Sequence, residues 1–311
     1  MRIAIMGAGG IGGYFGGRLA QSGADVAFIA RGAHLAALQK DGLRISSKLG
    51  DLHLEKVVAT HDPATLGRVD LVLFGVKLWD TESAARAIAP LVSGDSAVVS
   101  FQNGVQKDEE LRGILGDAAV VGGVAYIAAA IARPGVIAHT GTMQRLVFGE
   151  YDGRPSARTE AFLEACRRAA IDAELSSDIR REIWEKFVFL VGLSGTTATI
   201  RVPIGPIRAN WQTRTLLLDA MREVVAVGRA HGVSLSTDYA ENRLAFCDGL
   251  PAEMTSSMHG DLDRGSRLEV PWLSGSVVEL GKVAGVPTPV NRAINDILAL
   301  HANGHGSSRE S

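Results

Sequence analysis

The glycine-rich segment near the N-terminus constrains the fold more than any other part of the sequence. An apolar run at residues 2–6 leads into Gly7, Gly9 and Gly12, and a second apolar run follows at residues 24–30. A Gly-x-Gly-x-x-Gly pattern between a strand and a helix, with a second strand soon after, is typical of a dinucleotide-binding βαβ unit. Each glycine has its own task there: a tight turn, close approach of the backbone to a pyrophosphate, and close packing of helix on strand.

The same segment predicts how a dinucleotide would bind. Its phosphates would lie at the N-terminus of a helix over residues 11–21, where unpaired N–H groups and the helix dipole favour anions. The residues expected at the cofactor through this turn are Gly7, Gly9, Gly10, Ile11 and Gly12. The alternative is a tight strand–helix turn that binds no ligand.

The second apolar run ends at Arg31, where an NAD site usually has an acidic residue that accepts from the ribose 2′-hydroxyl. Asp25 stands at the opposite end of that run. A guanidinium can bind a 2′-phosphate through two hydrogen bonds, whereas a carboxylate would repel it. The sequence therefore predicts NADP(H) as the cofactor, with a solvated loop arginine as the alternative interpretation of Arg31.

Composition limits the remaining function classes. The chain has 311 residues, 46% of them hydrophobic, which is enough for two domains with real cores. Its formal net charge of −2 gives no positive electrostatic field that would attract nucleic acid or an anionic membrane. No run of about 18 apolar residues predicts a membrane span, and the glycines interrupt any signal-peptide core at the N-terminus. Cys166 and Cys247 are too few for a disulfide framework, so we expect reduced thiols in a cytoplasmic protein.

The sequence divides into two regions of different texture. Over residues 1–177, β-like runs alternate with helical stretches, which predicts a Rossmann-type, doubly wound α/β domain. Three runs with no helix between them, at residues 120–132, 135–141 and 145–150, predict further strands added in antiparallel fashion. Residues 178–311 have mainly helical spacing and predict an all-helical domain.

The histidines and the C-terminal tail carry little functional signal. The polar tail from about residue 303 is expected to be disordered, and its His301 and His305 are more consistent with solvent-exposed bystanders than with ligands. The eight histidines show no spacing with cysteines or carboxylates that would indicate a metal site, so no metal is expected.

Five polar residues farther along the chain stand in short motifs that bear on chemistry. They are Lys77 after the run VLFGVK, Asn103 in QNG, Lys186 in ExWxK, Ser257 in SSM and Glu269 in RxE. With the N-terminal glycines and the arginine after the second strand, these motifs resemble the ketopantoate reductase (2-dehydropantoate 2-reductase) family over nearly the whole chain. Each motif alone is a weak signal, but their order and spacing together are fairly specific.

The resemblance implies an N-terminal Rossmann domain, a C-terminal helical domain, a substrate cleft between them, and hydride transfer from NADPH to a 2-oxo acid. Lys186 would be the general acid, and Glu269 would pair with this lysine or with a substrate hydroxyl. Asn103 would orient substrate and nicotinamide, Ser257 would contact the substrate carboxylate, and Lys77 would lie near the cofactor.

Lys186 also has an interpretation that rests on the residues alone. Hydride addition to a ketone develops alkoxide charge, which a nearby ammonium can stabilise and protonate. Glu182 stands four residues earlier, however, so a surface ion pair along a helix is the competing interpretation.

The chain departs from the family's pattern at four positions. Leu190 and Ser194 share a helical face with Lys186 and are expected to line the substrate site, but relatives with established ketopantoate specificity carry asparagines there. Pro271 and Ser274 replace an aspartate and an asparagine farther along. An apolar wall cannot reward a substrate hydroxyl, so reduction is predicted more firmly than the identity of the 2-oxo acid.

The sequence thus favours an NADPH-dependent reductase of a small 2-oxo acid, with ketopantoate converted to pantoate in pantothenate and coenzyme A biosynthesis. A paralogue that reduces a less polar 2-oxo acid is the second hypothesis. A non-catalytic NADP(H)-sensing protein is the third, although it would have no use for Lys186, Asn103 and Glu269 together. The sequence leaves open whether the protein forms a homodimer.

Overall fold

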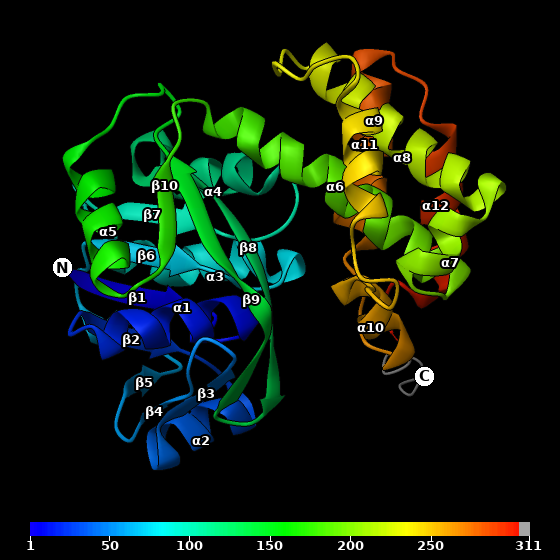
Figure 1. Cartoon of the computed structure of the whole chain (residues 1–311). Coiled ribbons are helices and arrows are strands. Elements are labelled where there is room, and N and C mark those ends of the chain that lie inside the picture. Colours follow the sequence, from blue (N-terminus) through cyan, green and yellow to red (C-terminus); the bar gives the residue numbers. More distant parts are fainter. Residues whose placement is uncertain (305–311) are drawn as a thin grey trace, which may run out of the picture. The chain divides into compact units, whose positions relative to one another are not determined.

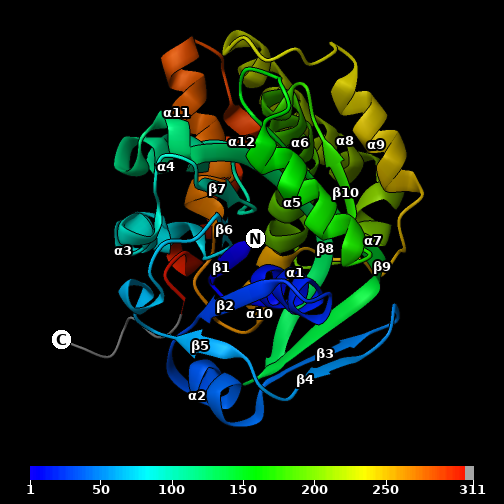
Figure 2. The same ribbon diagram turned by 90° about the vertical axis from the view of Figure 1, so that its left-hand side faces the viewer.

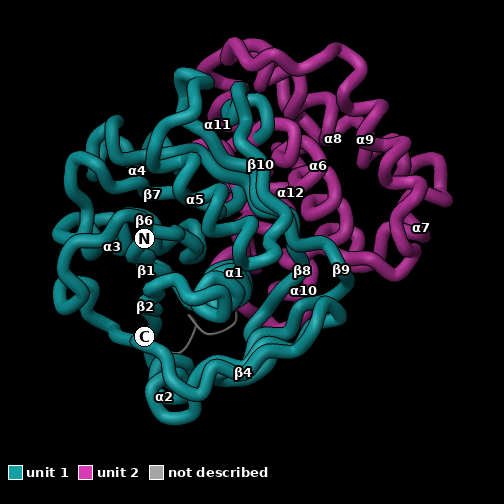
Figure 3. The backbone as a smooth tube through the Cα atoms, turned by 60° about the vertical axis from the view of Figure 1, so that its left-hand side comes forward, with its two compact units in different colours: residues 1–103, 107–182 teal, residues 104–106, 183–311 magenta. Residues whose placement is uncertain are grey.

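The computed structural model describes residues 1–304 and falls into two compact units (Figure 3). The first unit comprises Met1–Asn103 and Lys107–Glu182, and the second comprises Gly104–Gln106 and the chain from Ile183 onward. The predicted join at residue 178 lies just before the helix in which the two units meet along the chain. His305 and most of the tail expected to be disordered lie outside the described residues.

A mixed sheet forms the frame of the first unit and has ten strands over the described residues (Figure 1). In chain order these strands are β1 (Arg2–Met6), β2 (Asp25–Ile29), β3 (Leu43–Ser47), β4 (Leu52–Leu54), β5 (Val58–Thr60), β6 (Leu71–Phe74), β7 (Ala97–Ser100), β8 (Val120–Arg133), β9 (Val136–Gly149) and β10 (Asp172–Leu175). Across the sheet they follow the order β4-β3-β9-β8-β7-β6-β1-β2-β5, and β10 pairs with β9.

The part of the sheet from β5 to β8 is parallel at every pairing, in the order β5-β2-β1-β6-β7-β8. This is the strand order of a Rossmann sheet, in which the chain moves from β1 to one side and later returns to add strands on the other. The carboxyl ends of β1 and β6 therefore meet at the switch point, where sheets of this kind bind their ligands.

Alternate residues of the central strands enter two separate cores, one for each face of the sheet. The helices of this unit are α1 (Gly10–Gln21), α2 (Gly32–Asp41), α3 (Thr81–Ile88), α4 (Lys107–Leu115) and α5 (Ala157–Arg168). Ile5 of β1 packs in a cluster that contains Phe15 of α1 and Phe162 of α5, whereas its neighbour Ala4 packs in a cluster that contains Ile88 of α3. Since successive side chains of a strand point to opposite faces, both faces are covered, as Figures 1 and 2 show. The predicted doubly wound, Rossmann-type fold is confirmed.

One strand assignment made from the sequence is wrong. The runs at residues 135–141 and 145–150 are parts of a single strand, β9. The segment between them falls at a break in the β8–β9 register, where pairing passes from Ile127 with Gln144 to Ala129 with His139, and β9 continues through this irregularity. The expected antiparallel pairing is present between β8 and β9, while β8 itself runs parallel to β7. Strands β3, β4, β5 and β10 were not predicted, because runs of only three to five residues are too short for their pattern to stand out from a loop.

The second unit is helical over its described residues. Its helices are α6 (Ile179–Ile200, which starts in the first unit), α7 (Ile204–Ala209), α8 (Trp211–Ala230), α9 (Tyr239–Asp248), α10 (Ser257–Asp263), α11 (Ser274–Ala284) and α12 (Pro289–Leu298). Phe187 and Val191 of α6 share one buried cluster with Met221 and Val224 of α8. The four predicted helical stretches lie in α6, α8, α9 and α11, and the all-helical prediction is confirmed.

Candidate functional site

Gly7 makes the turn out of β1 at the switch point of the sheet. Its φ of +94° lies in the left-handed region that favours glycine. A Cβ on Gly7 would come within 2.9 Å of the backbone nitrogen of Val76, in the segment that follows β6. The N–H groups of Gly7 and Ala8 both donate to the Ile29 carbonyl at the end of β2, at 3.2 and 3.3 Å. The turn is thus fitted between the two strands that flank β1.

The following glycines have contrasting surroundings. A Cβ on Gly10 would lie 2.1 Å from the Ala129 carbonyl oxygen of β8, and one on Gly12 would lie 2.2 Å from the Gly7 carbonyl oxygen. At Gly9, no heavy atom of the described residues lies within 4 Å of that position, chain neighbours aside. Packing therefore requires glycine at two of these positions, while Gly9 leaves its side open. A dinucleotide site needs this combination of a closely packed helix and one bare backbone position for a pyrophosphate.

The start of α1 supplies hydrogen-bond donors at the same place. The helix begins at Gly10, and its N-cap residue Gly9 makes no side-chain cap. The first N–H groups of a helix have no partner within it, so they favour an anionic group placed there. Ile11 lies in this first turn and is half-buried.

Arg31 is the N-cap residue of α2, shortly after β2, and its side chain is 65% exposed. Its guanidinium lies 3.9 Å from a carboxylate oxygen of Asp80, a residue in the segment after β6. At this distance and exposure the pair contributes little to stability. Sequence reasoning missed Asp80, and the only signal for it was its position soon after a predicted strand at the switch point.

Lys77 is exposed in the same segment, immediately before a short 3-10 turn, Leu78–Asp80. Its ammonium lies 5.6 Å from the centre of the Trp79 ring, a distance at which a cation is attracted to an aromatic face. Two exposed cations, Arg31 and Lys77, therefore lie around the segment that follows β6. The carboxylate of Asp80 lies in the same segment.

Asn103 follows β7, and a chain of buried hydrogen bonds ties its segment to the one after β6. Gln102 accepts from the Ser100 hydroxyl at 3.0 Å and donates to the Thr81 hydroxyl at 2.9 Å. Thr81 in turn donates to the Leu78 carbonyl at 2.7 Å. Asn103 itself is half-buried. Gln102 and Thr81 were missed from the sequence because buried polar partners look the same there as polar loop residues.

A buried cation anchors the far side of this loop. The ammonium of Lys107, at the start of α4, donates to the carbonyls of Ser100 and Gly123 at 2.5 and 3.0 Å and lies 3.3 Å from an oxygen of Asp108. Burial lowers the pKa of Lys107, and the Asp108 carboxylate opposes that shift. The Tyr151 hydroxyl donates to Asp108 at 2.6 Å. Lys107 thereby links the end of β7 to the first residues of β8.

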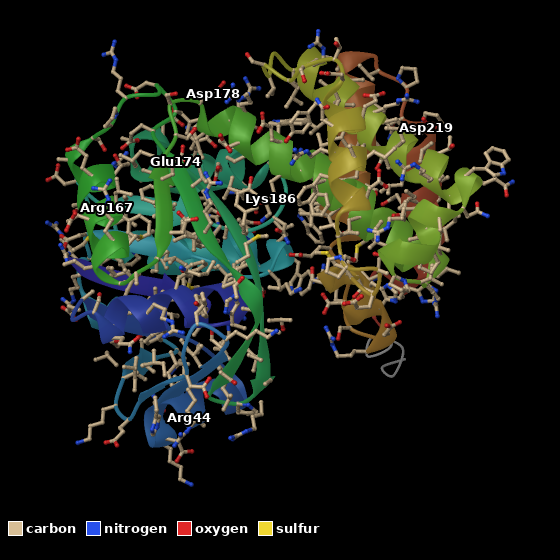
Figure 4. All side chains as sticks on the ribbon, in the orientation of Figure 1. Arg44, Arg167, Glu174, Asp178, Lys186 and Asp219 are labelled. Carbon is tan, nitrogen blue, oxygen red and sulfur yellow. The ribbon has the colours of Figure 1, made fainter. Side chains whose placement is uncertain are left out.

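The helical unit carries the predicted catalytic lysine. Lys186 lies on α6 (Figure 4). Leu190 follows one turn later, and both side chains are half-buried. Ser194, one turn farther, is fully buried, and its hydroxyl has no hydrogen-bond partner among the described residues. Ser194 is thus enclosed within its own unit, and its predicted contact with the substrate stays a prediction.

The starts of α10 and α11 flank the second half of α6. The Thr197 hydroxyl of α6 lies 3.0 Å from the hydroxyl of Ser256, which caps α10 by accepting from the His259 N–H at 3.0 Å. Ser257, the serine singled out from the sequence, is the first residue of α10 and is exposed. The buried Ser256 was not predicted, and only the doubled serine of the motif pointed to it.

Glu269 is buried ahead of a 3-10 turn, Val270–Trp272, that contains Pro271 and leads into α11. Ser274, the first residue of α11, is fully buried, and its hydroxyl also has no hydrogen-bond partner among the described residues. A Cβ on Gly195 of α6 would lie 3.5 Å from that hydroxyl. Ser194 and Ser274, the two serines that replace the family's asparagines, thus lie in neighbouring parts of the buried interior of the helical unit.

Residues 1–304 contain no group of three or more histidine, cysteine, aspartate and glutamate side chains arranged to hold a metal ion. Within the same residues, no helix is both long enough and apolar enough to cross a membrane.

Comparison with known proteins decides the family. Residues 3–153 match the family described as Ketopantoate reductase PanE/ApbA, and residues 178–302 match its C-terminal counterpart. The chain belongs to the ketopantoate reductase family. It is 35% identical over 300 residues to the 2-dehydropantoate 2-reductase of Archaeoglobus fulgidus, covering 96% of each chain. It is 30% identical over 301 residues to the uncharacterized oxidoreductase YkpB of Bacillus subtilis, covering 97% of this chain and 99% of that one.

A solved structure of the same family has the same fold. The PanE/ApbA family ketopantoate reductase from Ralstonia eutropha JMP134 superimposes with a TM-score of 0.89 at 34% identity, over 97% of this chain and 98% of that one. As a member of this family the protein is an oxidoreductase that acts on a CH–OH group with a nicotinamide cofactor. This excludes the purely sensory role considered from the sequence.

Substitution of Gly9 and of Gly10 by alanine should distinguish an effect on dinucleotide binding from an effect on the packing of α1. Gly10→Ala places a methyl group against the Ala129 carbonyl and should lower the free energy of unfolding by about 1–3 kcal/mol, as overpacking does. Gly9→Ala meets no such obstacle, so its urea unfolding midpoint should stay near that of the wild type while its affinity for the dinucleotide falls about tenfold or more. Equal binding by Gly9→Ala and the wild type would mean that the pyrophosphate does not lie beside Gly9.

Proposed function

We propose that this protein is an NADPH-dependent reductase of a 2-oxo acid, with 2-dehydropantoate as the substrate and pantoate as the product. The observation that carries the proposal is the bare backbone position at Gly9 beside a tightly packed helix start, with the guanidinium of Arg31 at the end of the next strand. Membership in a family of 2-dehydropantoate 2-reductases supports the substrate class.

The choice of NADPH over NADH rests on charge. The second residue after β2 is Arg31, and Lys77 adds a second exposed cation in the segment that follows β6. A 2′-phosphate can replace water around both cations, and it can form two hydrogen bonds with the guanidinium of Arg31. The weak contact between Arg31 and Asp80 is easily given up for such a partner.

The proposed chemistry needs a proton donor beside the ketone. A bound NADPH supplies the hydride that adds to the carbonyl carbon. The ammonium of Lys186 then stabilises the negative charge on the carbonyl oxygen and transfers its proton to that oxygen, which leaves a neutral lysine and a 2-hydroxy acid. Asn103 would orient the reacting groups, Ser257 would hold the substrate carboxylate, and the buried carboxyl of Glu269 would pair with the lysine or with a substrate hydroxyl.

A second substrate class, a 2-oxo acid without the hydroxyl of ketopantoate, is favoured by the side chains along α6. Leu190 can neither donate nor accept a hydrogen bond, and the hydroxyl of Ser194 is buried. A substrate hydroxyl placed against Leu190 without another partner would cost about 1–3 kcal/mol. A steady-state panel of 2-oxo acids with NADPH tests the proposed function directly, and ketopantoate is expected among the accepted substrates.

Arg31→Ala tests the cofactor assignment. Loss of a charge-assisted contact to the 2′-phosphate should cost about 1.5–3 kcal/mol in binding, so the KM for NADPH should rise by roughly one to two orders of magnitude. The KM for NADH should hardly change, since NADH has no phosphate at that position. Arg44→Ala, which removes an exposed arginine from β3, is the matched control. Equal effects of Arg31→Ala on the two cofactors would remove the basis for choosing NADPH.

Lys186→Ala tests the proton donor. Without a positioned acid, kcat should fall by about two orders of magnitude or more, while the affinity for NADPH should change little. Glu182→Ala removes the carboxylate that would pair with Lys186 in the competing interpretation, and it should leave kcat near the wild-type value. If Lys186→Ala keeps a kcat near the wild-type value, and both variants are only slightly less stable than the wild type, then Lys186 serves only as a surface ion-pair partner.

Leu190→Asn tests the origin of substrate choice. An asparagine here could hydrogen-bond the hydroxyl of ketopantoate, so the ratio of kcat/KM for ketopantoate to that for 2-oxoisovalerate should increase. The wild type should prefer ketopantoate less strongly than an asparagine-bearing relative does. An unchanged ratio in a variant with normal thermal unfolding would show that Leu190 does not face the substrate.

A further inference from the structure

His34 makes two hydrogen bonds that tie α2 to the glycine turn. It stands one turn after Arg31, and its Nε2 lies 2.8 Å from the carbonyl oxygen of Ala8, between Gly7 and Gly9. The backbone N–H of Gly135, in the turn between β8 and β9, donates to its Nδ1 at 3.1 Å. A backbone N–H can only donate, so Nδ1 is the acceptor and the ring proton resides on Nε2, which donates to Ala8.

The surroundings of His34 keep the imidazole in this neutral form. Burial lowers its pKa below the usual histidine value, and the hydrogen bond to the Ala8 carbonyl opposes that shift. A protonated ring would present a second N–H toward the N–H of Gly135, and the hydrogen bond to Nδ1 would be lost. Both contacts therefore belong to the neutral side chain at neutral pH.

The contact to Ala8 bears on Gly9 through the peptide plane. The Ala8 N–H donates to the Ile29 carbonyl, and its C=O accepts from His34, so the main chain is held on both sides of Ala8. In a trans peptide the C=O of one residue and the N–H of the next point in opposite directions. Holding the Ala8 carbonyl toward His34 therefore turns the Gly9 N–H away from it, and Gly9 is the glycine whose side is open.

We propose that His34 is a positioning residue for the cofactor's pyrophosphate: it holds the Ala8–Gly9 peptide so that the Gly9 N–H is directed to a phosphate oxygen. This inference rests on the proposed function of the glycine turn as the dinucleotide site. A phosphate is common to NADPH and NADH, so His34 serves both cofactors, whereas Arg31, three residues earlier, distinguishes between them.

Two amide side chains can each reproduce one of the two contacts. In His34→Gln the terminal NH₂ reaches about as far as Nε2 and can donate to Ala8, while no acceptor remains at the position of Nδ1. In His34→Asn the amide oxygen stands near the position of Nδ1 and can accept from Gly135, but the side chain is too short to reach Ala8. His34→Leu makes neither contact.

The test measures the dissociation constants of NADPH and NADH, by titration of protein fluorescence, for the wild type, these three variants and Arg31→Ala. His34→Leu and His34→Asn should weaken both cofactors by the same factor, about tenfold for the loss of one oriented donor, with kcat at saturating NADPH nearly unchanged. His34→Gln should stay within about twofold of the wild type. Arg31→Ala should weaken NADPH alone. Thermal unfolding of each variant tests its fold, and if His34→Leu does not fold, the comparison of Gln with Asn is sufficient.

Three results would overturn the inference. Rescue by Asn and not by Gln would mean that His34 only braces the turn at Gly135. Weakening of NADPH alone would place His34 at the 2′-phosphate. Unchanged binding in all three variants, beside a wild type that binds normally, would remove the role while leaving the proposed function intact. A wild type that binds neither dinucleotide would instead refute the proposed function and this inference with it.

Discussion

The close approach of α1 to the sheet is the constraint on which the nucleotide site depends. Atoms at the Cβ positions of Gly10 and Gly12 would overlap carbonyl oxygens of β8 and of the turn itself. Because the helix starts this near to the strands, its first N–H groups lie beside the carboxyl ends of β1 and β6, where a Rossmann sheet binds phosphate. Gly9 differs from its neighbours in that no packing demands it. Its open side is where the proposed pyrophosphate contact would be made.

The neutral and the charged side chains around this edge of the sheet have different roles. Neutral groups fix the backbone: Gln102 joins the segments after β6 and β7, and His34 holds the glycine turn. Their hydrogen bonds are buried or half-buried and do not weaken with salt as exposed ion pairs do. The cations Arg31 and Lys77 remain exposed, which leaves them available to a phosphate. A fixed backbone with exposed cations can bind a phosphate, and the pair of Arg31 with Asp80, at 3.9 Å, is too weak to compete strongly with it.

The sequence predicted the parts of this protein whose physical signals are local. The glycine spacing, the arginine after β2 and the apolar periodicity of α6 and α8 each arise within one turn or one strand, and the structure has these elements at the expected places. It did not predict the continuity of β9, since main-chain pairing leaves no trace in hydrophobicity. The sequence did not point to Asp80, Gln102 and His34 for another reason. Each has a partner far away along the chain, so only the fold brings the two together.

The helical unit shows why the reaction is easier to assign than the substrate. Transfer of a proton to a developing alkoxide needs one cation, and Lys186, the proposed donor, would serve whatever the rest of the substrate is. Recognition of a substrate hydroxyl needs a paired donor or acceptor, which Leu190 cannot offer. Ser194 and Ser274 do carry hydroxyls, yet both are buried and have no partner within residues 1–304, a state that costs about 1–3 kcal/mol for each group. Alanine at either position would avoid that cost, and no contact among residues 1–304 explains the two hydroxyls. A change of substrate within this family would therefore need changes at the side chains that recognise it, such as Leu190, and none at the proposed proton donor.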